Sequence, residues 1–112
     1  MSDATDSQSI IASISALAED LASKDVAVYG VAFDYLHFGS WTIETGHRHK
    51  RTLLEWDGKE GLLTASVAAV ADAQGRKNWK RVAERRIDMR GGDGMSKVFE
   101  SAKQFAIEFA DT

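Results

Sequence analysis

The apolar residues of the two terminal segments recur at the spacing of an amphipathic helix, and this pattern constrains the fold more than any other feature of the chain. It runs through residues 7–24 and again through residues 96–110. Asp6 or Ser7 is a suitable N-cap for the first segment. The apolar positions are Ile10, Ile11, Ile14, Leu17, Ala18 and Leu21 in one segment and Val98, Phe99, Ala102, Phe105, Ala106 and Phe109 in the other. We therefore predict a helix at each end.

The segment between these helices has the composition of β strands. Residues 26–38 are mainly β-branched, aromatic or small, and alternation places Tyr29, Val31, Phe33, Tyr35 and His37 on one face of a strand. A second strand begins at Trp41, and residues 47–57 either continue it or form a third strand. Because Asp57 and Gly58 form a strong hairpin signal, we expect the chain to return as a strand from Leu62.

Two later segments fit a strand and a helix alike. Residues 62–74 are rich in alanine and have a helical apolar spacing, but the preceding hairpin signal favours a strand through about Val70. Residues 79–88 stay open between the two structures. The expected fold is α+β: an N-terminal helix, an antiparallel meander of about four strands and a C-terminal helix, with both helices on one face of the sheet. We expect one domain over residues 1–112, with residues 1–6 as a flexible tail.

Composition narrows the classes of protein that the chain can belong to. The sequence has no cysteine, which excludes disulfides, thiolate metal sites and cysteine nucleophiles. The first residues are polar and acidic and do not resemble a signal peptide, and the longest weakly polar stretch is too short to cross a bilayer. We expect a cytoplasmic protein that does not bind membranes.

Charge is segregated along the chain, although the net charge is only −3. Residues 1–46 are acidic, residues 47–90 are basic, and the remainder is acidic again. Such a pattern steers an anionic partner, joins segments of the chain to one another, or pairs subunits.

The basic centre makes nucleic acid a candidate partner, since its cations can meet phosphates and its tryptophan can stack on a base. The candidate binding residues are Arg48, Lys50, Arg51, Trp79, Lys80 and Arg81. The order helix, strands, helix, with Lys97 near the start of the last helix, distantly resembles the double-stranded-RNA-binding domain. That family has several closely spaced lysines there and only Lys97 matches, so we assign no family.

Catalytic and metal-binding signals are few. His47 and His49 would share a strand face, as in some metal sites, but a third ligand such as His37 or Glu44 cannot be placed from the sequence. Asp34 is a carboxylate in an apolar segment, where burial would raise its pKa. Residues 91–94 could present helix amides to a phosphate, although Asp93 is more simply an N-cap. We assign no catalytic residue, no metal and no cofactor.

A protein-binding role is the leading functional hypothesis. Two helices cover one face of a sheet, and the chain has more large apolar side chains than we expect one covered face to need. They are Tyr29, Val31, Phe33, Tyr35, Trp41, Ile43, Trp56 and Trp79. We therefore expect a non-enzymatic protein-binding or self-associating module, such as a small adaptor, inhibitor or assembly factor, with a homodimer as the simplest form. The alternatives are a nucleic-acid-binding module that uses the basic central strands and a small enzyme that uses His47, His49 or Asp34.

Overall fold

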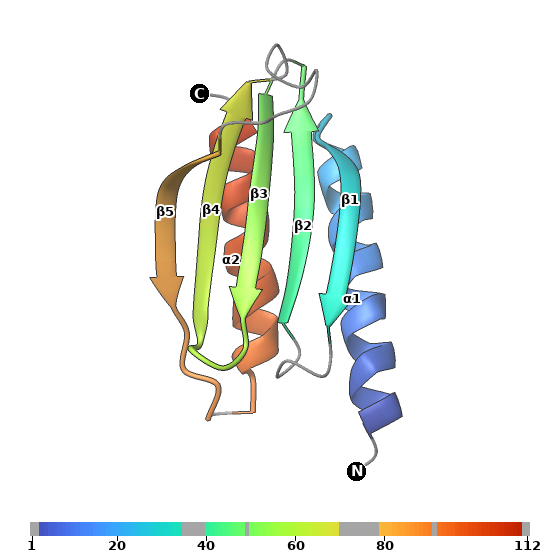
Figure 1. The fold of residues 1–112 in the computed structure, drawn as a ribbon. Helices are drawn as coiled ribbons and strands as arrows, with labels where there is room; N and C mark the ends of the chain where they lie inside the picture. Colours follow the sequence, from blue (N-terminus) through green and yellow to red (C-terminus); the bar gives the residue numbers. More distant parts are fainter. Residues whose placement is uncertain (1–2, 35–39, 49, 70–78, 91, 111–112) are drawn as a thin grey trace.

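The chain folds into a five-stranded antiparallel meander with two helices on one face of the sheet (Figure 1). The structure is a computed structural model and describes residues 3–34, 40–48, 50–69, 79–90 and 92–110. The strands lie in the order β1-β2-β3-β4-β5, so each strand pairs with its neighbours in sequence. The elements are α1 (Asp3–Ala22), β1 (Ala27–Asp34), β2 (Ser40–His47), β3 (Lys50–Asp57), β4 (Leu62–Ala69), β5 (Lys80–Arg86) and α2 (Gly94–Ala110).

The structure confirms the predicted fold class and decides the segments that were left open. The hairpin between β3 and β4 forms at the predicted turn, where the Asp57 side chain accepts hydrogen bonds from the amides of Lys59 and Glu60 and Gly61 takes a φ of 65°. The segment after this turn is a strand, as preferred, and the segment from Lys80 adds a fifth strand. Pairing to neighbouring strands outweighs the helical spacing in both segments.

Both helices begin earlier than predicted. α1 starts at Asp3, so the expected cap at Asp6 or Ser7 is wrong and residues 3–6 belong to the helix rather than to a tail. α2 starts at Gly94, directly after Asp93, whose carbonyl accepts the first helical hydrogen bond from the amide of Lys97. Asp93 therefore stands at the N-cap position, as predicted.

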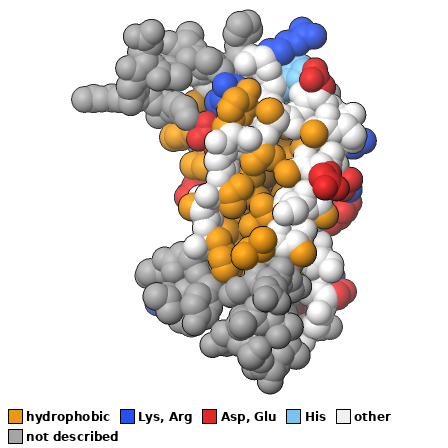
Figure 2. All heavy atoms as spheres, turned by 90° about the vertical axis from the view of Figure 1, so that its right-hand side faces the viewer, with side chains coloured by type: hydrophobic (Ala, Val, Ile, Leu, Met, Phe, Trp, Pro, Cys, Tyr) orange, Lys and Arg blue, Asp and Glu red, His pale blue; other side chains and the backbone are white. Residues whose placement is uncertain are grey.

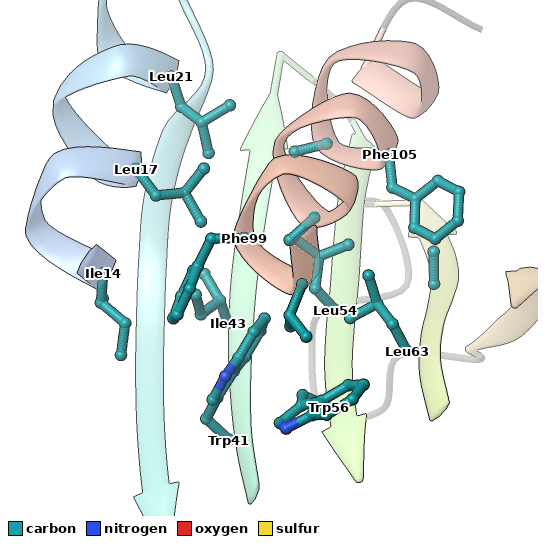
Figure 3. Packing of buried hydrophobic residues seen from close by; sticks show 14 of the residues in the cluster. Ile14, Leu17, Leu21, Trp41, Ile43, Leu54, Trp56, Leu63, Phe99 and Phe105 are labelled. Atoms are coloured by element: carbon teal, nitrogen blue, oxygen red, sulfur yellow. The ribbon is translucent and has the colours of Figure 1, made fainter. Parts of the chain in front are cut away.

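The hydrophobic core lies between the sheet and the two helices (Figure 3). α2 packs on β2, β3 and β4, whereas α1 packs on β1 and against α2. The ring of Phe99 stacks on Trp41 with 5.0 Å between the ring centroids. The most deeply buried side chains of this core include Leu21, Trp41, Ile43, Leu54, Leu63 and Val98.

Burial of Trp41, Ile43 and Trp56 corrects one step of the sequence argument. The sequence predicts that these three side chains belong to a surplus that a single covered face does not need, yet each is at most 2% exposed beneath the helices. They give no support to an exposed patch. Tyr35 and His37 lie outside the described residues, so only Tyr29 and Val31 of the surplus are strongly exposed in the described part of the chain.

Replacing Phe105 by alanine tests the docking of α2. The Phe105 side chain is 6% exposed, and Arg85 of β5 lies over its ring. We expect Phe105→Ala to lower the free energy of unfolding by about 3–5 kcal/mol, as is typical of a buried phenylalanine. Urea titration measures this loss. Phe109→Ala, at a half-buried position of the same helix, is the matched control and should cost less. A loss below about 1 kcal/mol for Phe105→Ala would mean that α2 is not docked in this way.

Candidate functional site

The two edge strands of the sheet differ sharply in character. β5 carries the charged and exposed residues Lys80, Arg81, Glu84, Arg85 and Arg86. β1 has no charged residue from position 27 to position 33. An edge strand presents unpaired backbone N–H and C=O groups, and proteins usually protect such edges with charges. β5 therefore has the character of a protected edge, and β1 has the character of an edge that another strand can join.

Two exposed apolar side chains belong to β1 and to α1, the helix that packs on it. Val31 of β1 is 48% exposed, and Ile11 of α1 is 55% exposed. A hydrogen bond from the amide of Val26 to the carbonyl of Leu21 joins the end of α1 to the start of β1. From that point, ten residues of helix and five residues of strand each span roughly 15 Å, so Ile11 and Val31 lie at about the same level. Figure 2, which views the molecule from this side, shows hydrophobic side chains gathered in one stripe.

We call the outer edge of β1, together with the exposed side chains of Val31 and Ile11, the β1 edge. Among the described residues no strand pairs with it. Val28 and Phe33 of the same strand are partly buried against the core, so the stripe continues inward to the core. The β1 edge thus combines free backbone hydrogen-bonding groups with apolar surface, which are the two elements of binding by strand addition.

A bulge in β1 turns Tyr29 to the face of the sheet that the helices do not cover. The pairing of β1 with β2 shifts register between Val28 and Gly30, so Tyr29 does not share a face with Val31 as alternation predicted. The guanidinium of Arg51 in β3 lies 3.6 Å from the centroid of the Tyr29 ring. Gly46 of β2 lies beneath this contact, since a Cβ atom there would come within 2.8 Å of the Tyr29 ring and 2.7 Å of the Arg51 guanidinium. The contact ties the edge strand to β3 across β2.

The uncovered face of the sheet also has a shallow depression of about 600 Å³. Small side chains such as Thr42 and Thr64 lie among charged residues of both signs. Because acidic and basic groups alternate around it, the depression does not select a single class of ligand by charge. Its described lining residues are Ala32, Phe33, Ser40, Trp41, Thr42, Glu55, Trp56, Asp57, Lys59, Leu62, Thr64 and Arg81.

The candidate nucleic-acid-binding residues gather at one end of the sheet but differ in availability. Arg48 lies in the β2–β3 turn, and Lys50 begins β3 and pairs with Ala69 at the end of β4. Trp79 directly precedes β5, whose first residue Lys80 pairs with Val67 of β4. Of this group, Arg48, Lys80 and Arg81 are exposed.

Arg51 belongs to the same group but is held by its neighbours. Its side chain is only 15% exposed, lies on Tyr29 and is 3.9 Å from a carboxylate oxygen of Glu44. The positive charge of Arg51 therefore contributes to the structure of the sheet and is poorly placed to meet a phosphate.

The residues proposed for catalysis are not brought together among the described side chains. His47 ends β2, and its Nδ1 atom lies 2.6 Å from the carbonyl oxygen of Asp25, which joins the α1–β1 turn to the sheet. His37 and His49 lie outside the described residues, and Asp34 is described only as the last backbone position of β1. In the described part of the chain no three His, Asp or Glu side chains are close enough to hold a metal ion.

One carboxylate in the described chain has a shifted pKa. Arg90 donates hydrogen bonds to the Asp88 carboxylate from its side chain and its backbone amide, and these bonds hold the pKa of Asp88 below its usual value. Both side chains are exposed in the segment between β5 and α2. The pair closes a surface turn and does not form an acid–base site.

Comparisons with protein-family models, with curated proteins and with solved structures found no match to this chain. Among the described helices, neither is both apolar and long enough to span a bilayer. The function is therefore argued from the chain's own residues.

Sequence reasoning missed the β1 edge, although the signal was present. The uncharged run from position 27 to position 33 and the charged run of β5 are both visible in the sequence. They acquire meaning only once these two segments are known to be the edges of one sheet.

Two glycines test the role of the Tyr29–Arg51 contact. Gly46→Ala should lower the free energy of unfolding by about 1–3 kcal/mol, because its Cβ atom would overlap Tyr29, Arg51 and the Lys50 carbonyl. Gly30→Ala is the matched control in β1, since nothing lies within 4 Å of its Cβ position, and it should be neutral or slightly stabilising. Equal losses in urea titrations of the two variants would contradict the contact.

Proposed function

We propose that this chain is a non-enzymatic protein-binding module that binds through the β1 edge. The observation that carries the proposal is the contrast between the two edges of the sheet, with charges along β5 and an uncharged β1 beside exposed Val31 and Ile11. Small adaptors, inhibitors and assembly factors act in this way. The functional class is the one that the sequence suggests. The binding surface is different, because it is the β1 edge and not a patch of surplus aromatic residues.

Strand addition suits the chemistry of this edge. The backbone groups of a joining strand pair with those of β1 and supply affinity, while side chains on alternate positions meet Val31 and its neighbours and supply specificity. Apolar burial adds about 25 cal/mol for each Å² removed from water. An exposed apolar edge is also an aggregation hazard, so a partner that covers it protects the protein.

Several polar side chains of the sheet have partners within the chain, which leaves the β1 edge as the better candidate for binding. His47 holds the turn after α1, and Arg51 is occupied by Tyr29 and Glu44. Arg85 of β5 donates hydrogen bonds to Ser101 and Gln104 of α2.

A charge placed on each edge tests this proposal. Val31→Lys puts an ammonium group where a joining strand would bury it, so it should weaken partner binding at least tenfold. Val82→Lys is the matched control, because Val82 is also a part-exposed valine of an edge strand and lies on the side already rich in charge. Binding of protein partners is measured by quantitative affinity capture from cells that express the chain. Equal retention of partners by wild type and both variants would reject the β1 edge as the binding surface.

Nucleic-acid binding is the second candidate, favoured by the exposure of Arg48, Lys80 and Arg81 at one end of the sheet. If phosphates bind there, affinity must fall steeply as salt rises, because bound cations release counterions.

Salt titrations with a double variant test this candidate. Replacing Lys80 and Arg81 by alanine should lower the slope of log affinity against log salt by about 1–2. Lys97→Ala, at the exposed start of α2 and outside this group of cations, is the control and should leave the slope unchanged. Fluorescence anisotropy with RNA and DNA, single- and double-stranded, measures both. Absence of binding at low salt would remove the candidate.

A further inference from the structure

We infer that the partner at the β1 edge is a single extended segment of another protein, which pairs with β1 as a sixth strand beneath α1. This occupant rests on the function proposed above and adds to it the form and the chemistry of the partner. Its side chains are apolar and uncharged on the side that faces α1, and polar residues are accepted on the other side.

α1 is wide enough to cover one more strand than it does. A helix with its side chains is about 10–12 Å wide and neighbouring strands lie about 4.8 Å apart, so one helix covers about two strands. α2 packs on β2, β3 and β4, whereas β1 is the strand on which α1 packs. Figure 1 shows α1 at the outer side of β1. Space for about one further strand therefore remains beneath α1, beside the β1 edge.

The flank of α1 that points away from α2 is uncharged. Asp20 marks the flank that faces α2, because its carboxylate lies 3.8 Å from the ammonium of Lys103. At about 100° per residue, Ile11 lies half a turn around the helix from Asp20 and points away from α2. Glu19 lies about 80° further round, on the side away from the core, so it borders this flank without belonging to it. We call this side the outer flank; its members are Ile11, Ser15, Ala18 and Ala22.

The outer flank has the size and surface to cover a short strand. Ile11, Ser15 and Ala22 are exposed, and Ala18 is half-buried. Apart from Ile11 the side chains are small, so a strand can approach the helix closely. The flank from Ile11 to Ala22 is about 16 Å long, which matches about five residues of an extended chain. A segment of about five to seven residues therefore fills the space.

The two sides of β1 differ in what they offer a joining strand. Val31 pairs with Ile43, a core residue, so its side chain projects on the side that the helices cover. A residue that joins beside Val31 on this side meets apolar surface and Ile11 of the outer flank. On the other side, Ala32 pairs with Thr42 of the uncovered face, and nothing lies within 4 Å of a Cβ atom placed on Gly30. Polar side chains there stay in contact with water.

Charge decides the chemistry of the occupant. Residues 26–33 and the outer flank have no charged side chain, so an ammonium or carboxylate group on the side facing α1 would lose water without gaining an opposite charge. The segment that fits therefore alternates apolar and polar residues and carries any charge on its water-facing side or at its ends.

The position of α1 decides that the occupant is one strand. A second copy that paired through its own β1 would bring its own α1 to the same face and the same space as the first. Any partner with a helix over its edge strand meets the same obstacle. A lone extended segment does not, because α1 already supplies the cover that this strand needs.

Peptide selection tests the form of the occupant. A random library of seven-residue peptides displayed on phage is selected against the wild-type chain. Enriched peptides should alternate apolar and polar residues, without charge at the apolar positions. When a synthetic copy of an enriched peptide binds, hydrogen exchange of the β1 amides should slow, because strand pairing protects backbone N–H groups. Enrichment without alternation, or unchanged exchange along β1, would overturn the inference.

Two neighbouring residues of α1 test whether the strand lies beneath that helix. Ile11→Lys should weaken binding of the enriched peptide about tenfold, because the ammonium group would lie against the joined strand. Ala12→Lys is the matched control, since Ala12 is exposed and points about 100° further from the core, and it should change affinity less than about twofold. Both replaced residues are exposed, so urea titration should show little loss of stability in either variant. Equal affinities of the two variants would contradict a strand beneath α1.

Three outcomes separate this inference from the function on which it rests. A protein partner lost in Val31→Lys but kept in Ile11→Lys, with no peptide enriched, would overturn the single strand and keep the β1 edge as the binding surface. A dimer of this chain that Val31→Lys dissociates in light scattering would likewise overturn the inference and keep the function. Absence of any association sensitive to Val31→Lys would overturn both.

Discussion

The packing of α2 on the middle of the sheet is the interaction on which the rest of the structure depends. Phe99 stacks on Trp41, and the small side chains of Ala102 and Ala106 are fully buried where the helix meets the strands. Small residues let a helix approach a sheet closely, so α2 occupies the surface of β2, β3 and β4. α1 is left with β1 and the flank of α2. Val31 lies in the strand that α1 covers, and it stays 48% exposed.

Charge segregation along the sequence has two separate consequences in the fold. Part of the charge has partners within the chain: Lys103 of α2 meets Asp20 of α1, and Arg85 of β5 donates hydrogen bonds to Ser101 and Gln104 of α2. Other charges of the basic centre lie exposed along β5. A sequence pattern that suggests one partner for the whole basic centre thus divides into contacts within the chain and one charged edge strand.

The sequence predicts those features of the fold that depend on neighbours along the chain. Helical spacing identifies α1 and α2, and Asp57 identifies the hairpin because its side chain caps the turn locally. The bulge at Tyr29 was not predictable from residue spacing, because it is a shift in the pairing of β1 with another strand, β2. The prediction that Trp41 and Trp56 are surplus side chains is wrong for a similar reason. The depth of the core depends on how the helices pack on the sheet, and residue spacing along the chain does not predict that depth.

The candidate binding surface, too, could not be identified from the chemistry of single residues. Residues that sequence reasoning selected for their chemistry, such as His47 and Arg51, prove to hold turns and strands together. The proposed binding surface is instead marked by ordinary residues, Val31 and Ile11, and by the lack of charge along β1. The lack of charge on β1 becomes informative when β1 is compared with β5, because the charges along β5 show how this chain protects an edge that faces solvent. An uncharged β1 in the same sheet is therefore better explained as a surface for pairing than as an edge left unprotected, because one fold would otherwise treat its two edges in opposite ways.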